Sequence, residues 1–327
     1  MEKLISVIIA TYKRIEGLIP TLESVRLQEY ANKELIIADD GSGNEIISII
    51  NKYIEENKKY FNSVTFIKNE TNLGTVKNIQ NAYRIAKGEI IKVLSPGDLF
   101  YDQMVLKNIN CYFEENSSLI ACGIPRTYHK KNDRIIDDFL YNYSTYINLN
   151  DSKKTLFNLL YASRYLIGAT LVFHKDIFEK FDLFLPDKVK YSEDLIQVYA
   201  TLKGIRIHLI DSYMIWYEYG SGISTSNNSS WSNIFIQDNV SFYKWLLENR
   251  LITKKNIRNV STKLSCFNKP GRYPTFFRCL KNPSFLTFKF LEKLYPQNDH
   301  HKEILSKHHK FLENQNDGFK ELIIRNY

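Results

Sequence analysis

Four short runs of apolar and often β-branched side chains fall within the first hundred residues. They have the character of parallel strands that are covered on both faces, and they are residues 4–10, 35–38, 64–68 and 90–94. The stretches between them carry apolar side chains at helical spacing, over residues 15–28, 45–57 and 75–86. Strands that alternate with helices of about a dozen residues predict right-handed β-α-β units and a mostly parallel sheet flanked by helices.

The pattern changes after residue 98. It then predicts a helix, a strand, a polar excursion, a strand, a helix and a strand, over residues 104–115, 119–125, 132–150, 166–174, 193–203 and 206–210. From residue 231 onward only helical patterns remain. We therefore expect an α/β domain over residues 1–230, with its ligand at the carboxyl ends of the strands, and a basic, aromatic-rich helical region over residues 231–327.

The chain carries a net charge of +8, and the excess lies near its end. Residues 231–327 contain 17 Lys and Arg against 8 Asp and Glu, whereas residues 1–230 contain 27 against 28. Such a region could meet phospholipid or nucleic acid. No RRM, KH or helix-turn-helix signature is present, and the positive charge lies away from the strand-end carboxylates. We expect no nucleic-acid partner, and keep a basic-tail nucleic-acid-binding module as the alternative of a different class.

No apolar run approaches the roughly 18 residues that a membrane span needs. The first apolar run is too short for a signal peptide, and Thr11-Tyr12-Lys13-Arg14 follows it instead of a cleavage site. The same four residues exclude a G-x-G-x-x-G fingerprint after the first strand, which argues against a dinucleotide-dependent oxidoreductase. These features predict a cytoplasmic protein.

Several polar motifs at the predicted strand ends resemble, in order and spacing, those of inverting family 2 glycosyltransferases with the GT-A fold. The matching segments are residues 6–14, residues 36–42, Asn72-Leu73-Gly74 with Asn78, residues 86–89, and Ser192-Glu193-Asp194. The resemblance covers residues 3–225. It implies a Rossmann-like sheet that binds a nucleotide-sugar. The family members that the chain resembles are bacterial glycosyltransferases that build capsular polysaccharides and exopolysaccharides.

A nucleotide-sugar donor presents a base, a ribose, a diphosphate and a sugar, and the resemblance places Thr11 and Tyr12 beside it. Tyr12 can supply an aromatic wall, and by resemblance Asp39 accepts a hydrogen bond from the base. Asp40, with Ser42, could reach the ribose hydroxyls or cap the following helix. Arg14 and Lys77 are candidate cations for the diphosphate, with a solvated helix face as the alternative.

The metal motif of the family is depleted in this chain. Members normally have an Asp-x-Asp triplet after the fourth strand, whereas Ser95 and Gly97 stand at those two positions here and Asp98 alone remains. We expect Mn²⁺ or Mg²⁺, if used, to arrive with the donor diphosphate, with Asp98 as its only acidic protein ligand.

A glycine- and serine-rich loop and nearby cations could compensate for the missing carboxylates. Ser221 and Ser224 lie in the loop 219–225, which the resemblance places over the diphosphate. Arg206 or His208 could add positive charge for the leaving group.

By resemblance, Asp194 is the general base that takes the proton of the acceptor hydroxyl, and Glu193 orients it or binds the acceptor. The alternative is a pair of acids that meets the dipole of a helix N-terminus. The expected function is inverting transfer of a sugar, with UDP as the expected nucleotide, to a hydroxyl of a surface glycan or a lipid-linked oligosaccharide. A metal-independent variant, or a degenerate homologue that binds sugar nucleotides without turnover, is the alternative within the fold.

Residues 273–295 mix aromatic with basic side chains, which is typical of a helix at a membrane interface. They predict either peripheral contact with the inner face of the plasma membrane or a homodimer contact.

Overall fold

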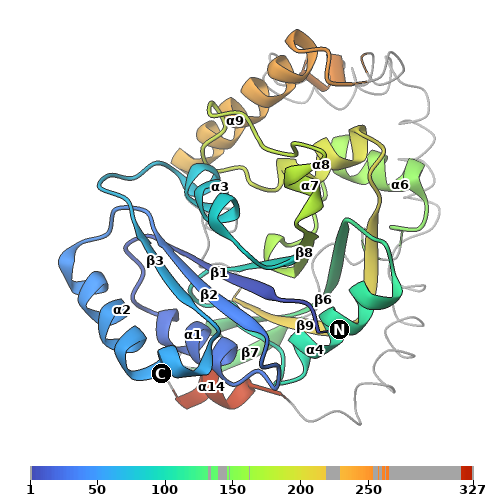
Figure 1. Cartoon of the computed structure of the whole chain (residues 1–327). Coiled ribbons are helices and arrows are strands. Elements are labelled where there is room, and N and C mark those ends of the chain that lie inside the picture. Colours follow the sequence, from blue (N-terminus) through green and yellow to red (C-terminus); the bar gives the residue numbers. More distant parts are fainter. Residues whose placement is uncertain are drawn as a thin grey trace.

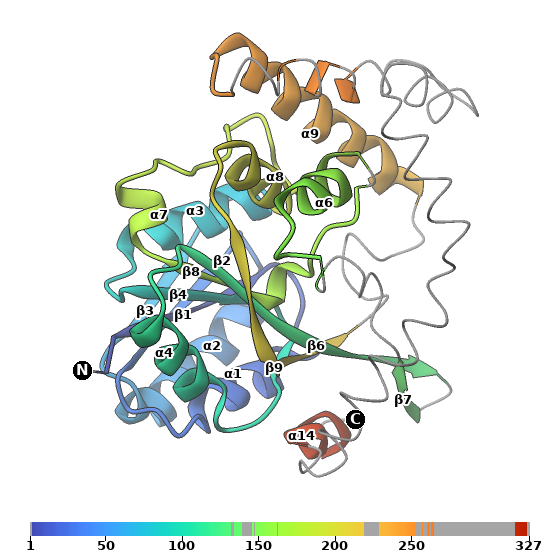
Figure 2. The same ribbon diagram turned by 90° about the vertical axis from the view of Figure 1, so that its right-hand side faces the viewer.

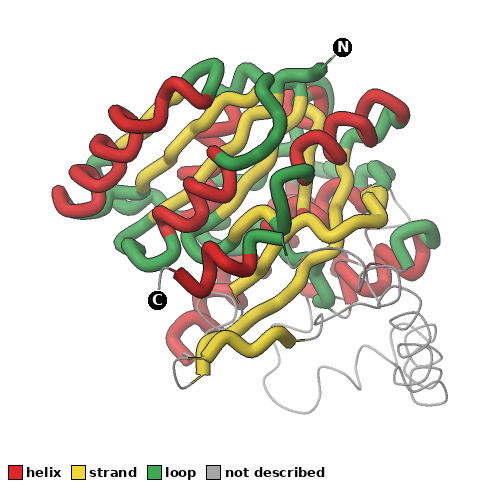
Figure 3. The backbone as a smooth tube through the Cα atoms, turned by 90° about the horizontal axis from the view of Figure 1, so that it is seen from below, coloured by secondary structure: helices red, strands yellow, loops and turns green. Residues whose placement is uncertain are grey.

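The computed structural model describes residues 2–131, 134–138, 146, 148–161, 163–218, 229–252, 257, 260–261, 263–264 and 318–325 of the chain. A nine-stranded mixed sheet runs through the molecule, and helices cover both of its faces (Figures 1 and 3). The strands follow the order β3-β2-β1-β4-β8-β6-β9-β5, and β7 pairs with β6. The predicted α/β class is confirmed.

The first half of the sheet is parallel, as the apolar pattern predicts. It consists of β1 (Ile5–Thr11), β2 (Lys33–Asp39), β3 (Val64–Lys68) and β4 (Ile90–Leu94). The crossovers are α1 (Leu18–Arg26), α2 (Asn44–Asn57) with the 3₁₀ turn η1 (Lys58–Tyr60), and α3 (Thr75–Ile85). Every residue of β1 and β2 is buried, which explains their near-continuous apolar sequence.

The second half of the sheet is mixed. It adds β5 (Leu99–Phe100), β6 (Ile120–Lys131), β7 (Arg134–Asp138), β8 (Leu171–His174) and β9 (Ile207–Glu218). The pairs β4–β8, β8–β6, β6–β7 and β9–β5 are antiparallel, whereas β6–β9 is parallel. The two long strands β6 and β9 cross the molecule side by side as a twisted ribbon (Figure 2).

Four sequence predictions in this half need correction. The strands predicted over residues 119–125 and 206–210 extend to Lys131 and Glu218, because their outer halves pair with each other and contain polar residues that interrupt the apolar pattern. The strand predicted over 166–174 is only β8, since Gly168–Thr170 form the 3₁₀ turn η3. The polar excursion 132–150 contains β7.

Two apolar clusters pack the two faces of the sheet. One contains side chains of α3, α7 (Asp176–Glu179), α8 (Leu195–Leu202) and α9 (Ser229–Glu248). The other contains side chains of α1, α2 and α4 (Val105–Glu115). A short helix, α6 (Ser152–Leu156), and the π-turn η2 (Phe157–Tyr161) adjoin the first cluster.

The described parts of residues 231–327 pack against the body of the protein. Phe242, Tyr243 and Leu246 of α9 are fully buried in the first cluster. Phe319 and Leu322, at α14 (Lys320–Arg325), lie against the second cluster. Residues 273–295 lie outside the described residues. Among the helices that the structure describes, none is long and apolar enough to cross a membrane.

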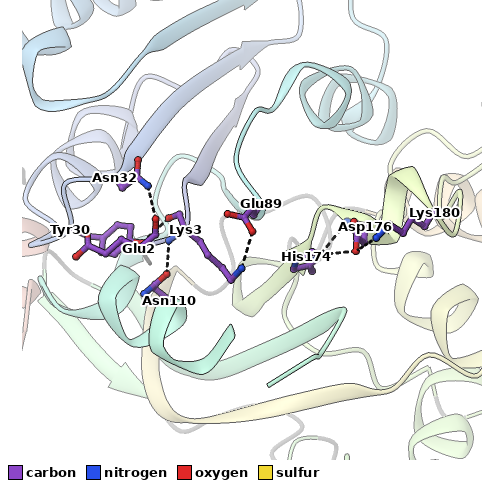
Figure 4. A network of polar contacts seen from close by, with 9 residues as sticks. All are labelled: Glu2, Lys3, Tyr30, Asn32, Glu89, Asn110, His174, Asp176 and Lys180. Atoms are coloured by element: carbon purple, nitrogen blue, oxygen red, sulfur yellow. Dashed lines mark hydrogen bonds and ion pairs between the residues drawn. The ribbon is translucent and has the colours of Figure 1, made fainter. Parts of the chain in front are cut away.

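The amino end of the sheet is held by the Glu34 carboxylate. It accepts hydrogen bonds from the Ser6 and Ser63 hydroxyls, at 2.6 and 3.0 Å, and from the Lys87 N–H at 2.7 Å. The motif at residues 86–89 is therefore structural. Figure 4 shows the neighbouring surface network, in which Lys3 reaches Glu89 at 2.8 Å. This edge lies opposite to the one that carries the candidate site.

Candidate active site

The ends of β1 and β2 present two buried polar atoms without partners. Thr11 lies opposite Asp39 in the parallel register. Asp39 is fully buried, and its Oδ2 accepts a hydrogen bond from the Ser42 N–H at 2.8 Å. Its Oδ1 and the Thr11 Oγ1 have no hydrogen-bond partner among the described residues. Because buried polar atoms are rarely left unpaired, this pair is a candidate contact for a ligand that offers an N–H or O–H group.

An exposed aromatic ring stands beside these atoms. Tyr12 is 40% exposed, and the Lys13 ammonium lies 5.2 Å from the centre of its ring. The Lys13 N–H donates to the Ser42 hydroxyl at 2.8 Å, which ties the loop after β1 to the loop after β2. Tyr12, the residue expected to supply an aromatic wall, is thus exposed at the strand end.

Asp40 holds a loop. Its carboxylate accepts from the N–H groups of Leu73 and Gly74, at 2.8 and 2.9 Å, and from the Asn69 amide at 3.1 Å. The Asn78 amide adds to this network, since it donates to the carbonyl of Ala38 and accepts from Asn69. These bonds give Asp40 a positioning role, because they fix the loop after β3 against the end of β2.

The turn after β4 is packed tightly. Gly97 has a φ of +102°, a backbone conformation that residues with a side chain rarely adopt. The Tyr128 hydroxyl donates to the Gly97 carbonyl at 2.7 Å, and the Gly97 N–H donates to the Thr21 hydroxyl at 3.0 Å. A β-carbon at Gly17 would lie 2.5 Å from the Gly97 nitrogen, so the two glycines let the backbones touch. The conformation of the turn 95–98 is therefore fixed from several sides.

An ion pair fills the space beside this turn. The Arg14 guanidinium is hydrogen-bonded to the Glu218 carboxylate at the end of β9. A β-carbon at Gly97 would lie 2.3 Å from the Glu218 Oε2 and 2.8 Å from the Arg14 Nη2. Glu218 was not identified from the sequence, because the strand that presents it was expected to end at residue 210.

Asp98 is buried between these charges. Burial raises the pKa of its carboxyl to about 7, and the Arg14 guanidinium opposes that rise. Lys92, fully buried in β4, contributes a weaker opposing charge. The Lys92 ammonium donates to the carbonyls of Ala169 and Leu171 and thereby links β4 to η3.

The acidic pair lies directly before α8. Asp194 is half-buried, and its Oδ1 accepts from the Gln197 amide at 3.1 Å and lies 3.4 Å from the position of a β-carbon at Gly168. Burial raises the pKa of both Glu193 and Asp194, and the charges of Asp194, Asp238 and Asp98 add to the effect on Glu193. Asp194 is the N-cap residue of α8, where the dipole alternative would place it, and its side chain makes no capping hydrogen bond to the helix.

Asp238 of α9 holds the segment that leads into this pair. Its carboxylate is 4% exposed and accepts from the backbone N–H groups of Lys190, Tyr191 and Ser192, at 3.1, 2.8 and 2.9 Å. No motif marks Asp238 in the sequence, and the polar pattern of α9 alone does not distinguish it from a solvent-facing acid. The helix after residue 230 therefore contributes directly to the site.

The other predicted residues differ in their surroundings. Lys77 forms an exposed ion pair with Asp187 at 2.8 Å. Arg206 and His208 flank the amino end of β9, ten or more residues before Glu218, so the expectation that they meet the leaving group is wrong. A strand of that length separates its ends by about 30 Å. Ser221 and Ser224 lie outside the described residues, whereas Ser95 is in the turn beside Asp98, with its carbonyl accepting from the Asp98 N–H.

The side chains near these strand ends are not a suitable set of ligands for a divalent cation. Mg²⁺ and Mn²⁺ need several oxygen ligands, mostly carboxylates, waters and phosphates. The described residues contain no cluster of three or more His, Cys, Asp or Glu that could hold a metal ion. Gly97 offers no side chain, and cationic Arg14 and Lys92 flank Asp98.

Comparison with known proteins identifies the family. Residues 6–182 match the model of Glycosyl transferase family 2. The chain is 35% identical over 137 residues to an uncharacterised glycosyltransferase of Rickettsia conorii, covering 40% of this chain and 20% of that protein. It is 33% identical over 108 residues to the Escherichia coli UDP-Glc:α-D-GlcNAc-diphosphoundecaprenol β-1,3-glucosyltransferase WfaP, covering 33% of this chain and 41% of that protein. The chain thus spans less than two thirds of the curated relatives' length.

Solved structures show the same fold. Staphylococcus aureus TarS 1–349 in complex with UDP-GlcNAc matches with a TM-score of 0.57 and 16% identity, over 90% of this chain and 92% of that one. The mannosyltransferase PcManGT from Pyrobaculum calidifontis, in complex with GDP-Man and Mn²⁺, matches with a TM-score of 0.56 and 12% identity, over 96% and 82%. The chain belongs to Glycosyl transferase family 2.

The three bonds to Asp238 generate a stability prediction. Asp238→Ala leaves three backbone N–H groups without their acceptor, so the free energy of unfolding should fall by about 2 kcal/mol or more. Urea denaturation measures it, with Glu248→Ala on the exposed face of the same helix as the control. Equal midpoints for the two variants would contradict the role of Asp238.

The acidic pair generates a pH prediction. A carboxyl whose pKa is raised in the folded state binds its proton more tightly there, so its contribution to stability is greatest below about pH 4, where the unfolded carboxyl titrates, and is lost as the pH rises toward neutrality and above. Glu193→Gln should therefore lose less stability than the wild type between pH 4.5 and pH 8. Urea titrations without nucleotide test this, with Glu55→Gln on the exposed face of α2 as the control. Parallel curves for wild type and Glu193→Gln would refute the burial of that charge.

Proposed function

We propose that this family 2 protein is an inverting glycosyltransferase that moves a sugar from a nucleoside diphosphate, with UDP as the nucleotide, to a hydroxyl of a glycan or lipid-linked acceptor. One observation carries the proposal: the loop after β3 connects the strand ends that offer the unpaired Asp39 and Thr11 atoms to the segment before the half-buried Glu193–Asp194 pair. The Gly74 N–H of that loop donates to Asp40 at 2.9 Å, and the Val76 N–H that follows it donates to the Lys190 carbonyl at 2.9 Å. These contacts support a single site for the donor-binding and proton-accepting groups.

The nucleotide binds at the ends of β1 and β2. Uracil carries an imide N–H that can donate to the unpaired Oδ1 of Asp39, and its ring can lie against exposed Tyr12. Thr11 Oγ1 is free to bond to the base or ribose. Two relatives support a UDP donor by their names alone, since WfaP is described with UDP-Glc and TarS was solved with UDP-GlcNAc.

Asp194 is the general base. In a single in-line displacement the acceptor oxygen bonds to the anomeric carbon, its proton passes to Asp194, and the electron pair of the breaking C–O bond stays on the departing diphosphate. A base works best when its pKa lies near the working pH, and burial raises the pKa of Asp194 in that direction. The Gln197 amide orients the carboxylate, and Glu193 holds the acceptor.

The acceptor is proposed by class only. WfaP is named for an acceptor in which GlcNAc is attached to diphosphoundecaprenol, and a lipid-linked acceptor of that kind would place this protein at the inner face of the plasma membrane. The basic and aromatic residues 273–295 would supply peripheral membrane contact, with a homodimer as the other role for them.

Replacing the general base, Asp194, tests the proposed proton transfer. Asp194→Asn keeps the shape but cannot accept the proton, so sugar transfer or donor hydrolysis should fall by about 10²–10⁴-fold, while UDP affinity changes little. A panel of UDP- and GDP-sugars first identifies the donor, and Asp182→Asn, at an exposed position, serves as the control. Near-normal turnover by Asp194→Asn would remove it from the mechanism.

Replacing the base-recognition carboxylate tests the donor site. Asp39→Asn replaces the carboxylate that accepts the hydrogen bond of the uracil imide N–H by a neutral amide. UDP binding should therefore weaken by about 1–3 kcal/mol. Calorimetry with UDP measures the change, and exposed Glu70→Gln is the matched control. Unchanged affinity in Asp39→Asn would place the nucleotide elsewhere.

A further inference from the structure

We propose that the guanidinium of Arg14, hydrogen-bonded to Glu218 beside the turn that carries Asp98, is a built-in cation that binds the donor diphosphate and makes the protein independent of a divalent metal. The proposal rests on the proposed function for the identity of the donor. It goes beyond that function by assigning the group that meets the charge of the leaving nucleotide.

The first support is the geometry at Gly97. This residue occupies the position where a second carboxylate would stand, but its φ of +102° disfavours any side chain. The space that a side chain would enter is filled, because its β-carbon would lie 2.3 Å from the Glu218 Oε2 and 2.8 Å from the Arg14 Nη2. An ion pair has taken the place of a metal-binding side chain.

The second support is the charge balance. Arg14 interacts with two carboxylates, since it is hydrogen-bonded to Glu218 and its charge opposes the rise in the pKa of Asp98. A divalent cation that used these two carboxylates would have to displace the guanidinium from Glu218. The permanent charge of arginine makes that displacement unfavourable, because arginine is not deprotonated at ordinary pH.

The third support is access. The Arg14 side chain is 26% exposed, whereas the Glu218 side chain is 9% exposed. Arg14 follows the exposed Tyr12 by two residues, at the strand end that offers the unpaired Asp39 oxygen. A nucleotide bound there through its base would extend its diphosphate toward the guanidinium.

The chemistry suits a guanidinium. When the bond between the anomeric carbon and the phosphate oxygen breaks, the electron pair stays on the nucleotide, and the diphosphate gains negative charge. The planar N–H groups of arginine can donate to two phosphate oxygens at once. Glu218 fixes the orientation of Arg14 before the donor arrives, so little reorganisation is needed during the reaction.

Calorimetry of the full chain with UDP and with uridine tests the proposal, in EDTA and in Mn²⁺. Wild type should bind UDP equally in both buffers. Arg14→Ala should weaken UDP binding by about 10- to 100-fold, the effect of a lost charge-assisted contact, and should leave uridine binding unchanged. Arg14→Lys should recover part of the lost UDP affinity. Arg84→Ala, near the C-terminal end of α3, should bind UDP as tightly as the wild type. Thermal melts confirm that each variant is folded.

Two outcomes overturn the proposal while the proposed function stands. They are loss of wild-type UDP binding in EDTA with recovery in Mn²⁺, and normal UDP binding by folded Arg14→Ala. In the first case Asp98 and Glu218 would be metal ligands. Failure of the wild type to bind UDP or uridine in either buffer would instead refute the proposed UDP donor together with this inference.

The Gly97→Asp variant provides a second, independent test that does not use the nucleotide. The added carboxylate should lower the midpoint of thermal unfolding, because it meets Glu218 and requires a strained backbone, and it should not create a Mn²⁺ site. A folded Gly97→Asp protein that keeps the wild-type midpoint and binds Mn²⁺ tightly, seen by electron paramagnetic resonance, would show that the space is open to a metal and would overturn the proposal.

Discussion

The parallel register of β1 with β2 and β4 determines where the polar groups of the site lie. Thr11 is level with Asp39, and Ile9 with Leu94, so the chain leaves all three strands at the same edge. The loops that begin there carry Tyr12, Arg14, Asp40 and Asp98. Because every residue of β1 and β2 is buried, a one-residue slip of the register would exchange side chains between the two packed faces and disrupt the packing of both. The core therefore fixes the geometry of the site.

The polar groups at this edge oppose the stability that the core provides. Asp98 is buried, and Glu193 and Asp194 are half-buried. In all three, loss of solvent raises the pKa, which means that their ionised forms are disfavoured in the folded protein. The Arg14 charge opposes the rise in the pKa of Asp98. Asp238 accepts hydrogen bonds from three N–H groups before the pair and so stabilises that segment, while its charge adds to the rise in the pKa of Glu193. A substrate that supplies a proton or a hydrogen bond to these groups would remove part of that cost.

The sequence was informative where local pattern and local chemistry coincide. The first four strands and the position of Asp39 at a strand end could be predicted, because buried parallel strands are apolar throughout and a polar motif follows each directly. Glu218 and Asp238 could not, because their roles depend on contacts with Arg14 and with residues 190–192, which are distant along the chain. The length of β9 was underestimated for the same reason, since its outer half is stabilised by pairing with β6.

The site divides into two parts with different origins in the chain. The family match ends at residue 182 and contains the strand ends that would recognise the nucleotide. Glu193, Asp194, Glu218 and Asp238 all follow it, and α9 brings Asp238 back to the segment before the acidic pair. Under the proposed function, the acceptor hydroxyl must meet Asp194, so the acceptor lies against groups from this later part. A change of acceptor could then arise in residues 183–248 while the nucleotide half, held by the parallel sheet, stays the same.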